Sequence, residues 1–181
     1  MSPDLLPIFD FDGTLLDSDA ALVAPFVALG VRAEEVTFGA LLADECARLG
    51  VTVNDYLERY DESAAIPFEG VDNMIRQLDR WAMCSNKHPG SGRAELRRLD
   101  WEPEVALFAD AFAGPKQLGP VLDALGADAR NVLFVGDTDH DRGCAKAVGC
   151  RFAIATWNPR ASVADGDIVL TSPDEVLQLL R

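Results

Sequence analysis

Short apolar runs that end in polar residues alternate with helical stretches along most of this chain. Each apolar run is typical of a strand buried on both faces, and the runs comprise residues 5–11, 81–85, 131–135, 152–155 and 168–170, with a further candidate at 107–112. Helical patterns lie between and after them, at 71–80, 93–99, 120–125, 141–148 and after Ser172. This alternation predicts an α/β fold with a doubly wound parallel sheet covered by helices on both faces. Ligands in such sheets bind beyond the carboxyl ends of the strands.

Residues 17–65 interrupt the alternation with helical patterns alone. The candidate helices are 18–29, 33–49 and 52–63, separated by Gly30 and Gly50 as stop signals, and no strand pattern occurs between them. We therefore predict an α/β core formed by residues 1–16 and 66–181, with a small helical domain, residues 17–65, inserted after the first strand.

Composition excludes several classes of partner. The net charge of −14 argues against nucleic acid and anionic membranes, and it means that an anionic substrate needs a local positive site or a metal ion. No apolar run approaches the roughly 20 residues of a membrane span, and no signal-peptide pattern opens the chain. The four cysteines form no CxxC pair. We expect a cytoplasmic protein with buried thiols, as a monomer or homodimer, without membrane or nucleic-acid partners.

The first apolar run ends in two acids and a turn, Asp10-Phe11-Asp12-Gly13-Thr14. Alternate strand residues point to opposite faces, so a regular strand cannot aim both carboxylates at one ligand. Gly13 allows the chain to swivel at this point. Two carboxylates with their main-chain carbonyls suit a hard cation such as Mg²⁺, and through it a phosphate group.

Three further polar clusters follow predicted strands or precede a helix. Ser85-Asn86 ends the run 81–84, and Gly136-Asp137-Thr138-Asp139-His140-Asp141 ends the run 131–135. Lys116 lies between them, just before a short helix. If the sheet is parallel, these clusters and Asp10 meet at one edge of it.

In this order the four clusters resemble the four motifs of the haloacid dehalogenase superfamily. The resemblance covers nearly the whole chain and is nearest to the phosphoglycolate-phosphatase-like branch, which has a helical cap inserted after the first motif. It implies a Rossmann-like core and a Mg²⁺-dependent phosphatase that hydrolyses a small phosphate monoester through an aspartyl-phosphate. Phosphoglycolate, sugar phosphates and nucleotide monophosphates are all admissible substrates.

The resemblance also implies roles for individual residues. Asp10 is the expected nucleophile, and Asp12 is the expected general acid and base. Lys116 is expected to hold the phosphoryl oxygens, together with the substrate-binding Ser85 and Asn86. The expected Mg²⁺ ligands are Asp10, the carbonyl of Asp12 and Asp137, while Asp141 orders the shell or contacts the lysine.

Each assignment has a structural alternative, and the chain departs from the family in two places. Asp12-Gly13 is also an ordinary turn, Ser85 could cap a helix, and Lys116 could be a surface lysine. Gln117 stands where the family usually has proline, and the insert is short for a cap. In the insert, Arg32, Arg48 and Arg59 could bind a substrate carboxylate, although an exposed helix face is the more ordinary interpretation.

Three alternatives to a phosphatase share this scaffold. A dehalogenase lacks the second carboxylate, so Asp12 argues against that reaction. A sugar phosphomutase uses both aspartates and stays open on motifs alone. A non-catalytic binding protein on the same scaffold is disfavoured, since every essential position is filled.

Overall fold

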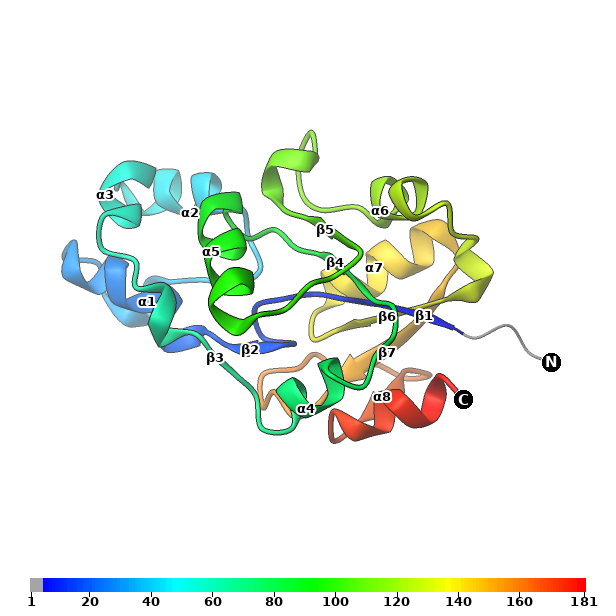
Figure 1. Cartoon of the computed structure of the whole chain (residues 1–181). Coiled ribbons are helices and arrows are strands. Elements are labelled where there is room, and N and C mark those ends of the chain that lie inside the picture. Colours follow the sequence, from blue (N-terminus) through cyan, green and yellow to red (C-terminus); the bar gives the residue numbers. More distant parts are fainter. Residues whose placement is uncertain (1–4) are drawn as a thin grey trace.

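A six-stranded parallel sheet forms the centre of the protein in this computed structural model, which describes residues 5–181 (Figure 1). The strand order is β5-β4-β1-β6-β7-β8, and every neighbouring pair is parallel. The strands are β1 Leu6–Phe9, β4 Ala82–Cys84, β5 Val105–Leu107, β6 Val132–Gly136, β7 Arg151–Ala155 and β8 Ile168–Leu170. The predicted α/β class with a doubly wound sheet is confirmed.

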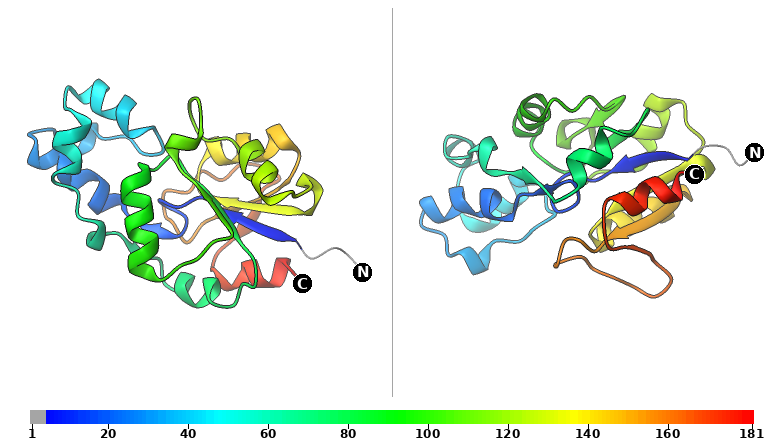
Figure 2. Two further views of the ribbon diagram at one scale, coloured as in Figure 1. Left: turned by 45° about the horizontal axis from the view of Figure 1, so that its top comes forward. Right: turned by 60° about the horizontal axis from the view of Figure 1, so that its bottom comes forward.

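Helices cover both faces of the sheet, as the wholly buried strands β1 and β6 require. Alternate residues of β1 enter different cores: Phe9 joins one apolar cluster, while Leu6 and Ile8 join the other. In Figure 1, α6 Leu118–Leu125 and α7 Asp139–Val148 lie above the strands, and α4 Val71–Ile75 and α8 Asp174–Leu179 lie below. Two further views show the same layers (Figure 2).

The segment between Asp17 and Ile66, which we call the helical insert, lies beyond the carboxyl ends of the strands (Figure 1). It contains α1 Asp19–Ala28, α2 Leu42–Leu49 and α3 Val53–Leu57. Two short strands absent from the sequence-based prediction join its ends, because β2 Leu16–Asp17 pairs antiparallel with β3 Ile66–Pro67. Two residues per strand are too few to produce a period-2 pattern, and they leave no signal in the sequence.

The predicted helix at 33–49 is broken in the structure. A single 3₁₀ turn covers Ala33–Glu35, residues 36–41 are irregular, and α2 begins at Leu42. Gly39 has a φ of +84°, which a right-handed helix cannot accommodate. The loop formed by residues 36–41 therefore crosses toward the core instead of extending the helix.

Other boundaries differ by a few residues. The strand predicted at 107–112 is misplaced: β5 covers Val105–Leu107 and shares only Leu107 with it, and a 3₁₀ turn, Ala109–Ala111, follows. The helix predicted at 93–99 begins earlier, as α5 Pro89–Leu99, with the proline in its first turn. Within residues 5–181 there is no helix both long and apolar enough to cross a membrane.

Candidate active site

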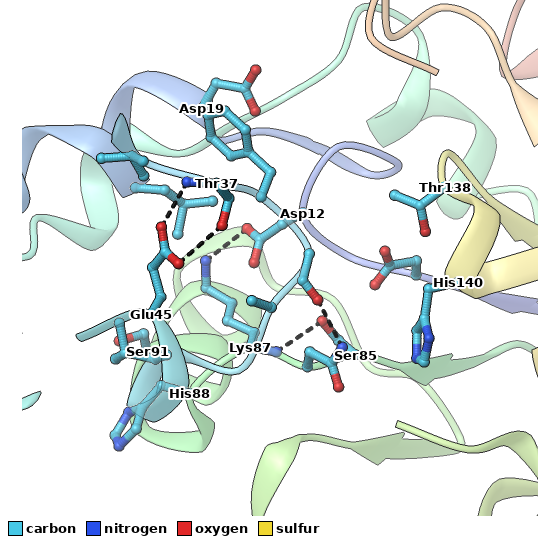
Figure 3. Close-up of a pocket in the computed structure, with 18 of the residues that line it drawn as sticks. Asp12, Asp19, Thr37, Glu45, Ser85, Lys87, His88, Ser91, Thr138 and His140 are labelled. Carbon is cyan, nitrogen blue, oxygen red and sulfur yellow. Dashed lines mark hydrogen bonds and ion pairs between the residues drawn. The ribbon is translucent and has the colours of Figure 1, made fainter. Parts of the chain in front are cut away.

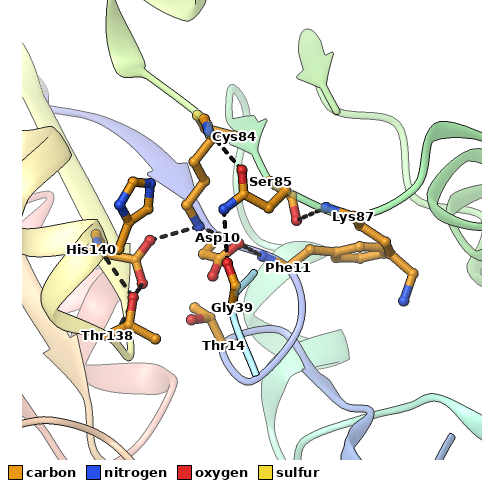
Figure 4. Close-up of polar contacts among 12 residues, drawn as sticks. Asp10, Phe11, Thr14, Gly39, Cys84, Ser85, Lys87, Thr138 and His140 are labelled. Carbon is orange, nitrogen blue, oxygen red and sulfur yellow. Dashed lines mark hydrogen bonds and ion pairs between the residues drawn. The ribbon is translucent and has the colours of Figure 1, made fainter. Parts of the chain in front are cut away.

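Three neighbouring strands end in polar residues that meet at one edge of the sheet. Asp10 follows β1, Ser85 follows β4 and Asp137 follows β6, and these strands are adjacent in the order β4-β1-β6. Asp10 and Ser85 lie close together in the close-up, with Thr138 at the start of α7 beside them (Figure 4). The strand-end clusters found in the sequence therefore share one pocket, as a parallel sheet requires.

Lys116 is buried against two of these carboxylates. Its side chain is only 3% exposed, and its Nζ lies 2.8 Å from Asp10 Oδ1 and 2.7 Å from Asp141 Oδ1. Burial opposes the charge on Lys116, but the coulombic effect of Asp10 and Asp141 outweighs it and raises the lysine pKa above its usual range. The alternative of a surface lysine is excluded, and the ammonium points into the predicted site.

Asp10, Asp137 and Asp141 form a compact acidic cluster. One carboxylate oxygen from each lies within 4.8 Å of the others. Thr14 Oγ1 donates to Asp137 Oδ1 at 3.0 Å, and Asn158 Nδ2 donates to Asp137 Oδ2 at 2.9 Å. Burial works to raise the pKa of both Asp10 and Asp137, while the Lys116 ammonium works to lower it at each.

This donor set fits a hard divalent cation. The cluster supplies only carboxylate oxygens, which Mg²⁺ prefers. One buried lysine faces three buried acids here, so a cation would offset the remaining negative charge.

Asp12 is oriented differently from Asp10. Its carboxylate lies outside the acidic cluster found among the described residues, and Oδ1 instead accepts from Lys87 Nζ at 2.8 Å (Figure 3). Gly13, with a φ of +81°, makes this turn possible. A Cβ there would lie 2.5 Å from Asp137 Oδ2, so glycine is also required by the close approach. The predicted metal contact through the Asp12 carbonyl stays a prediction.

Ser85 and Asn86 lie beside Asp10 but differ in their contacts. Ser85 is not a helix cap, because α5 has His88 at its N-cap, and its hydroxyl accepts from the main-chain N–H of Lys87 at 3.2 Å. Asn86 connects two parts of the site. Its Nδ2 donates to the carbonyl of Gly39 in the helical insert at 2.9 Å, and its Oδ1 accepts from the N–H of Lys116 at 2.6 Å.

The helical insert supplies an apolar wall opposite the acids. Leu22, Phe26, Val36, Phe38 and Leu42 line the pocket on this side. Arg160, from the loop after β7, also lines it; the guanidinium lies 4.1 Å from the centroid of the Phe38 ring and pairs with Asp19. The insert arginines Arg32, Arg48 and Arg59 do not line this pocket and pair with neighbouring glutamates.

Sequence reasoning missed several residues of the site. Lys87 has no role in the sequence-based interpretation, although it directly follows Ser85-Asn86. Thr14 and Asn158 bind Asp137, and Glu95 and Tyr60 bind Lys87. Thr14 lies within a motif and Lys87 directly follows one, so their positions in the sequence were a usable signal. Asn158, Glu95 and Tyr60 lie in segments that contain no motif.

The sequence is similar to those of known hydrolases. Residues 7–155 match the haloacid dehalogenase-like hydrolase family. The chain is 27% identical over 205 positions to a phosphoglycolate phosphatase of Xanthomonas campestris, covering 93% of each chain. It is 23% identical over 210 positions to an N-acetylmuramic acid 6-phosphate phosphatase of Pseudomonas aeruginosa, covering 96% of this chain and 93% of the relative.

Solved structures share the fold. A predicted phosphoglycolate phosphatase from Haemophilus somnus superposes with a TM-score of 0.81 at 18% identity, covering both chains completely. Structural similarity at 18% identity shows a shared fold alone. The family match, in contrast, spans most of the sequence and includes the strand-end residues from Asp10 to Asp141. This chain belongs to the haloacid dehalogenase-like hydrolases.

Proposed function

We propose that this protein is a Mg²⁺-dependent phosphatase that hydrolyses a small phosphate monoester through an aspartyl-phosphate on Asp10. The observation that carries the proposal is the setting of Asp10. Its carboxylate lies at the end of β1, in contact with Lys116 and within 4.8 Å of carboxylate oxygens of Asp137 and Asp141. Its relatives from Xanthomonas and Pseudomonas are named as phosphatases, which supports the same chemistry here.

The chain's own residues account for both halves of the reaction. Asp10 attacks phosphorus and the ester P–O bond breaks, with its electron pair leaving on the alcohol oxygen. Asp12 donates a proton to that oxygen. In the second half, Asp12 takes a proton from water, the water oxygen attacks phosphorus, and the carboxylate of Asp10 is released. Lys116 and the Ser85 hydroxyl hold phosphoryl oxygens as charge shifts between them.

Mg²⁺ would be held by Asp10 and Asp137, with the Asp12 carbonyl as the further predicted ligand and Asp141 ordering Lys116. When bound, the ion reduces repulsion between the anionic phosphate and the anionic nucleophile. Asn158 and Thr14 orient Asp137 toward this position from outside the cluster.

The pocket favours a leaving group without a negative charge. Each lysine or arginine that lines it already has a carboxylate partner: Lys87 has Asp12, Lys116 has Asp10, and Arg160 has Asp19. The wall formed by Leu22, Phe26, Val36, Phe38 and Leu42 is apolar. A carboxylate on the leaving group, as in phosphoglycolate, would therefore lose water without gaining an unpaired cation. We accordingly place uncharged sugar or other neutral leaving groups ahead of phosphoglycolate.

Release of inorganic phosphate from a panel of esters tests the proposal. The panel contains 4-nitrophenyl phosphate, glucose 6-phosphate, AMP and phosphoglycolate, each with Mg²⁺ and with EDTA. We expect Mg²⁺-dependent release from at least one ester, and faster release from an ester with a neutral leaving group than from phosphoglycolate. Conversion of a sugar phosphate to its isomer without phosphate release would identify a mutase instead. Binding without turnover of any ester would identify a non-catalytic protein.

We also propose that the protein works in the cytoplasm. All four cysteines are free thiols, three of them buried, which suits a reducing cytoplasm. Whether the chain works as a monomer or homodimer stays a prediction, which sedimentation of the purified protein would decide.

A further inference from the structure

Lys87 is a buried lysine that does not contact Asp10. It lies in the turn between β4 and α5, with a side chain only 3% exposed. Its Nζ lies 2.8 Å from Asp12 Oδ1, 3.1 Å from Glu95 Oε2 and 3.0 Å from the hydroxyl oxygen of Tyr60. Figure 3 shows the ammonium group directed at Asp12. These partners come from the first motif, from α5 and from the helical insert, respectively.

Buried groups surround the Lys87 ammonium on the side away from Asp12. Glu95 is completely buried, and its Oε1 accepts a 2.5 Å hydrogen bond from the Tyr60 hydroxyl. The rings of Phe11 and Tyr60 lie 5.8 and 5.1 Å from the ammonium group, measured to their centroids. A buried ammonium needs such partners, and Lys87 has two carboxylates and a phenol. Asp12 and Tyr60 line the same pocket as Asp10, whereas Glu95 does not, so Asp12 is the carboxylate partner that faces the candidate active site.

We propose that Lys87, Glu95 and Tyr60 are positioning residues that orient Asp12 for proton transfer to the leaving oxygen. The inference rests on the proposed function, since it gives Asp12 a proton to move. Lys87 holds Oδ1 of Asp12, which leaves Oδ2 free to exchange a proton with the ester oxygen or with water. Glu95 shares the ammonium, so Lys87 is not bound to Asp12 alone.

Tyr60 makes this orientation depend on the helical insert. It lies between α3 and the 3₁₀ turn Glu62–Ala64, and its ring stacks on Tyr56 within the insert at 5.9 Å. Among residues 5–181, the Tyr60 hydroxyl is the only group of the insert that forms a hydrogen bond or ion pair with the Lys87 ammonium. Proton transfer at Asp12 is thus coupled to how the insert sits on α5.

The simpler alternative is a structural ion pair that merely joins α5 and the insert to the core. The two roles differ in their dependence on the leaving group. An alkoxide must be protonated as it leaves, whereas 4-nitrophenolate is stable without a proton. Since kcat/KM for an aspartyl-phosphate mechanism reports events up to release of the alcohol, it isolates the step in which Asp12 acts as an acid.

The test compares kcat/KM for 4-nitrophenyl phosphate with kcat/KM for the panel's alkyl ester that wild type hydrolyses fastest, both with Mg²⁺. For Tyr60→Phe and Lys87→Met, we expect the alkyl value to fall on the order of 10-fold and 100-fold respectively, and the aryl value to fall by less than about 3-fold. Lys87→Arg should recover part of the alkyl rate, because it restores a cation.

Two matched controls accompany these variants. Tyr56→Phe removes a buried hydroxyl that donates to the Leu22 carbonyl and does not touch Lys87, and Lys146→Met removes an exposed lysine. Neither should change the ratio of the two kcat/KM values. Equal losses for both esters, or an unchanged alkyl value, in a Tyr60→Phe protein that unfolds at the wild-type temperature would overturn the inference. Wild type that hydrolyses neither ester would instead contradict the proposed function.

Discussion

Asn158, from the segment after β7, holds Asp137 in place through a buried hydrogen bond. Its Nδ2 donates at 2.9 Å both to Asp137 Oδ2 and to the carbonyl of Gly13, so one side chain links the fourth motif to the first. Asn158 is 3% exposed, and it belongs to the loop after β7, outside all of the motifs recognised in the sequence.

Asn158→Ala should weaken Mg²⁺ binding by about 10- to 100-fold, the usual effect of losing a residue that orients a ligand. Titration calorimetry with Mg²⁺ measures the change, with Asn73→Ala on the exposed side of α4 as control. Equal Mg²⁺ affinity in wild type and Asn158→Ala would remove Asp137 from the proposed metal site.

Lys116→Met should reduce turnover by at least about 100-fold, because the phosphoryl oxygens lose a charged donor. Without Mg²⁺ it should also lower the free energy of unfolding by about 3–5 kcal/mol, since Asp10 and Asp141 are left buried without a cation. Urea unfolding and steady-state kinetics measure the two effects. Lys146→Met is the control, with a change within about 0.5 kcal/mol; a similar small change for Lys116→Met would contradict the ion pairs described here.

Gly92 and Gly143 offer a matched pair of helix substitutions. A Cβ on Gly92 would lie 2.2 Å from the buried ring of Phe108, whereas a Cβ on Gly143 meets no atom within 4 Å. Gly92→Ala should therefore destabilise the protein by about 1–3 kcal/mol through overpacking. Gly143→Ala should stabilise it by about 0.5–1 kcal/mol through helix propensity. Urea denaturation compares them, and the same sign for both would contradict the packing of α5 on Phe108.

Glu45 anchors the loop 36–41 beside the pocket. Its carboxylate accepts from the main-chain N–H of Thr37 at 2.6 Å and pairs with Arg48 at 2.6 Å. Burial works to raise the pKa of Glu45, but hydrogen bonds from Arg48 and Thr37 outweigh it and lower the pKa below its usual 4.5. Because the folded pKa is depressed, its contribution is complete above the unfolded value near 4.5 and is lost as the pH falls through the folded pKa.

Glu45→Gln should therefore cost about 1.5–3 kcal/mol of unfolding free energy at pH 7, as expected for hydrogen bonds to a charged group. The difference from wild type should shrink as the pH is lowered below 4.5. Urea unfolding at a series of pH values between 7 and 3 follows it. A difference that grows toward low pH would mean that the anchored carboxylate has a raised pKa.

The strand-end residues could be predicted from sequence because each depends on a few neighbours in the chain. An apolar run followed by Asp10, Ser85 or Asp137 carries its own local signal, and the parallel sheet brings these runs together. The surface alternative for Lys116 could be dismissed only in the structure, where its side chain is 3% exposed.

What the sequence did not reveal depends on contacts between distant segments. Asp12 and Lys87 are 75 residues apart, and Tyr60 and Glu95 are 35 apart, so no periodicity or spacing connects them. The break in the predicted helix at 33–49 has a similar origin. The loop 36–41 is held by Glu45 and by Asn86, through the Gly39 carbonyl, and these tertiary contacts compete with local helix propensity.

The central claim is that Asp10 carries the phosphoryl group. Phosphate release with Mg²⁺ should be measured for wild type and for Asp10→Asn, which keeps the shape of the side chain and removes the nucleophile, on the ester that wild type hydrolyses fastest. We expect Mg²⁺-dependent turnover in wild type and a loss of at least about 10⁴-fold in Asp10→Asn, as for removal of a covalent nucleophile. Full activity in Asp10→Asn, or a wild type inactive on every ester, would contradict the account.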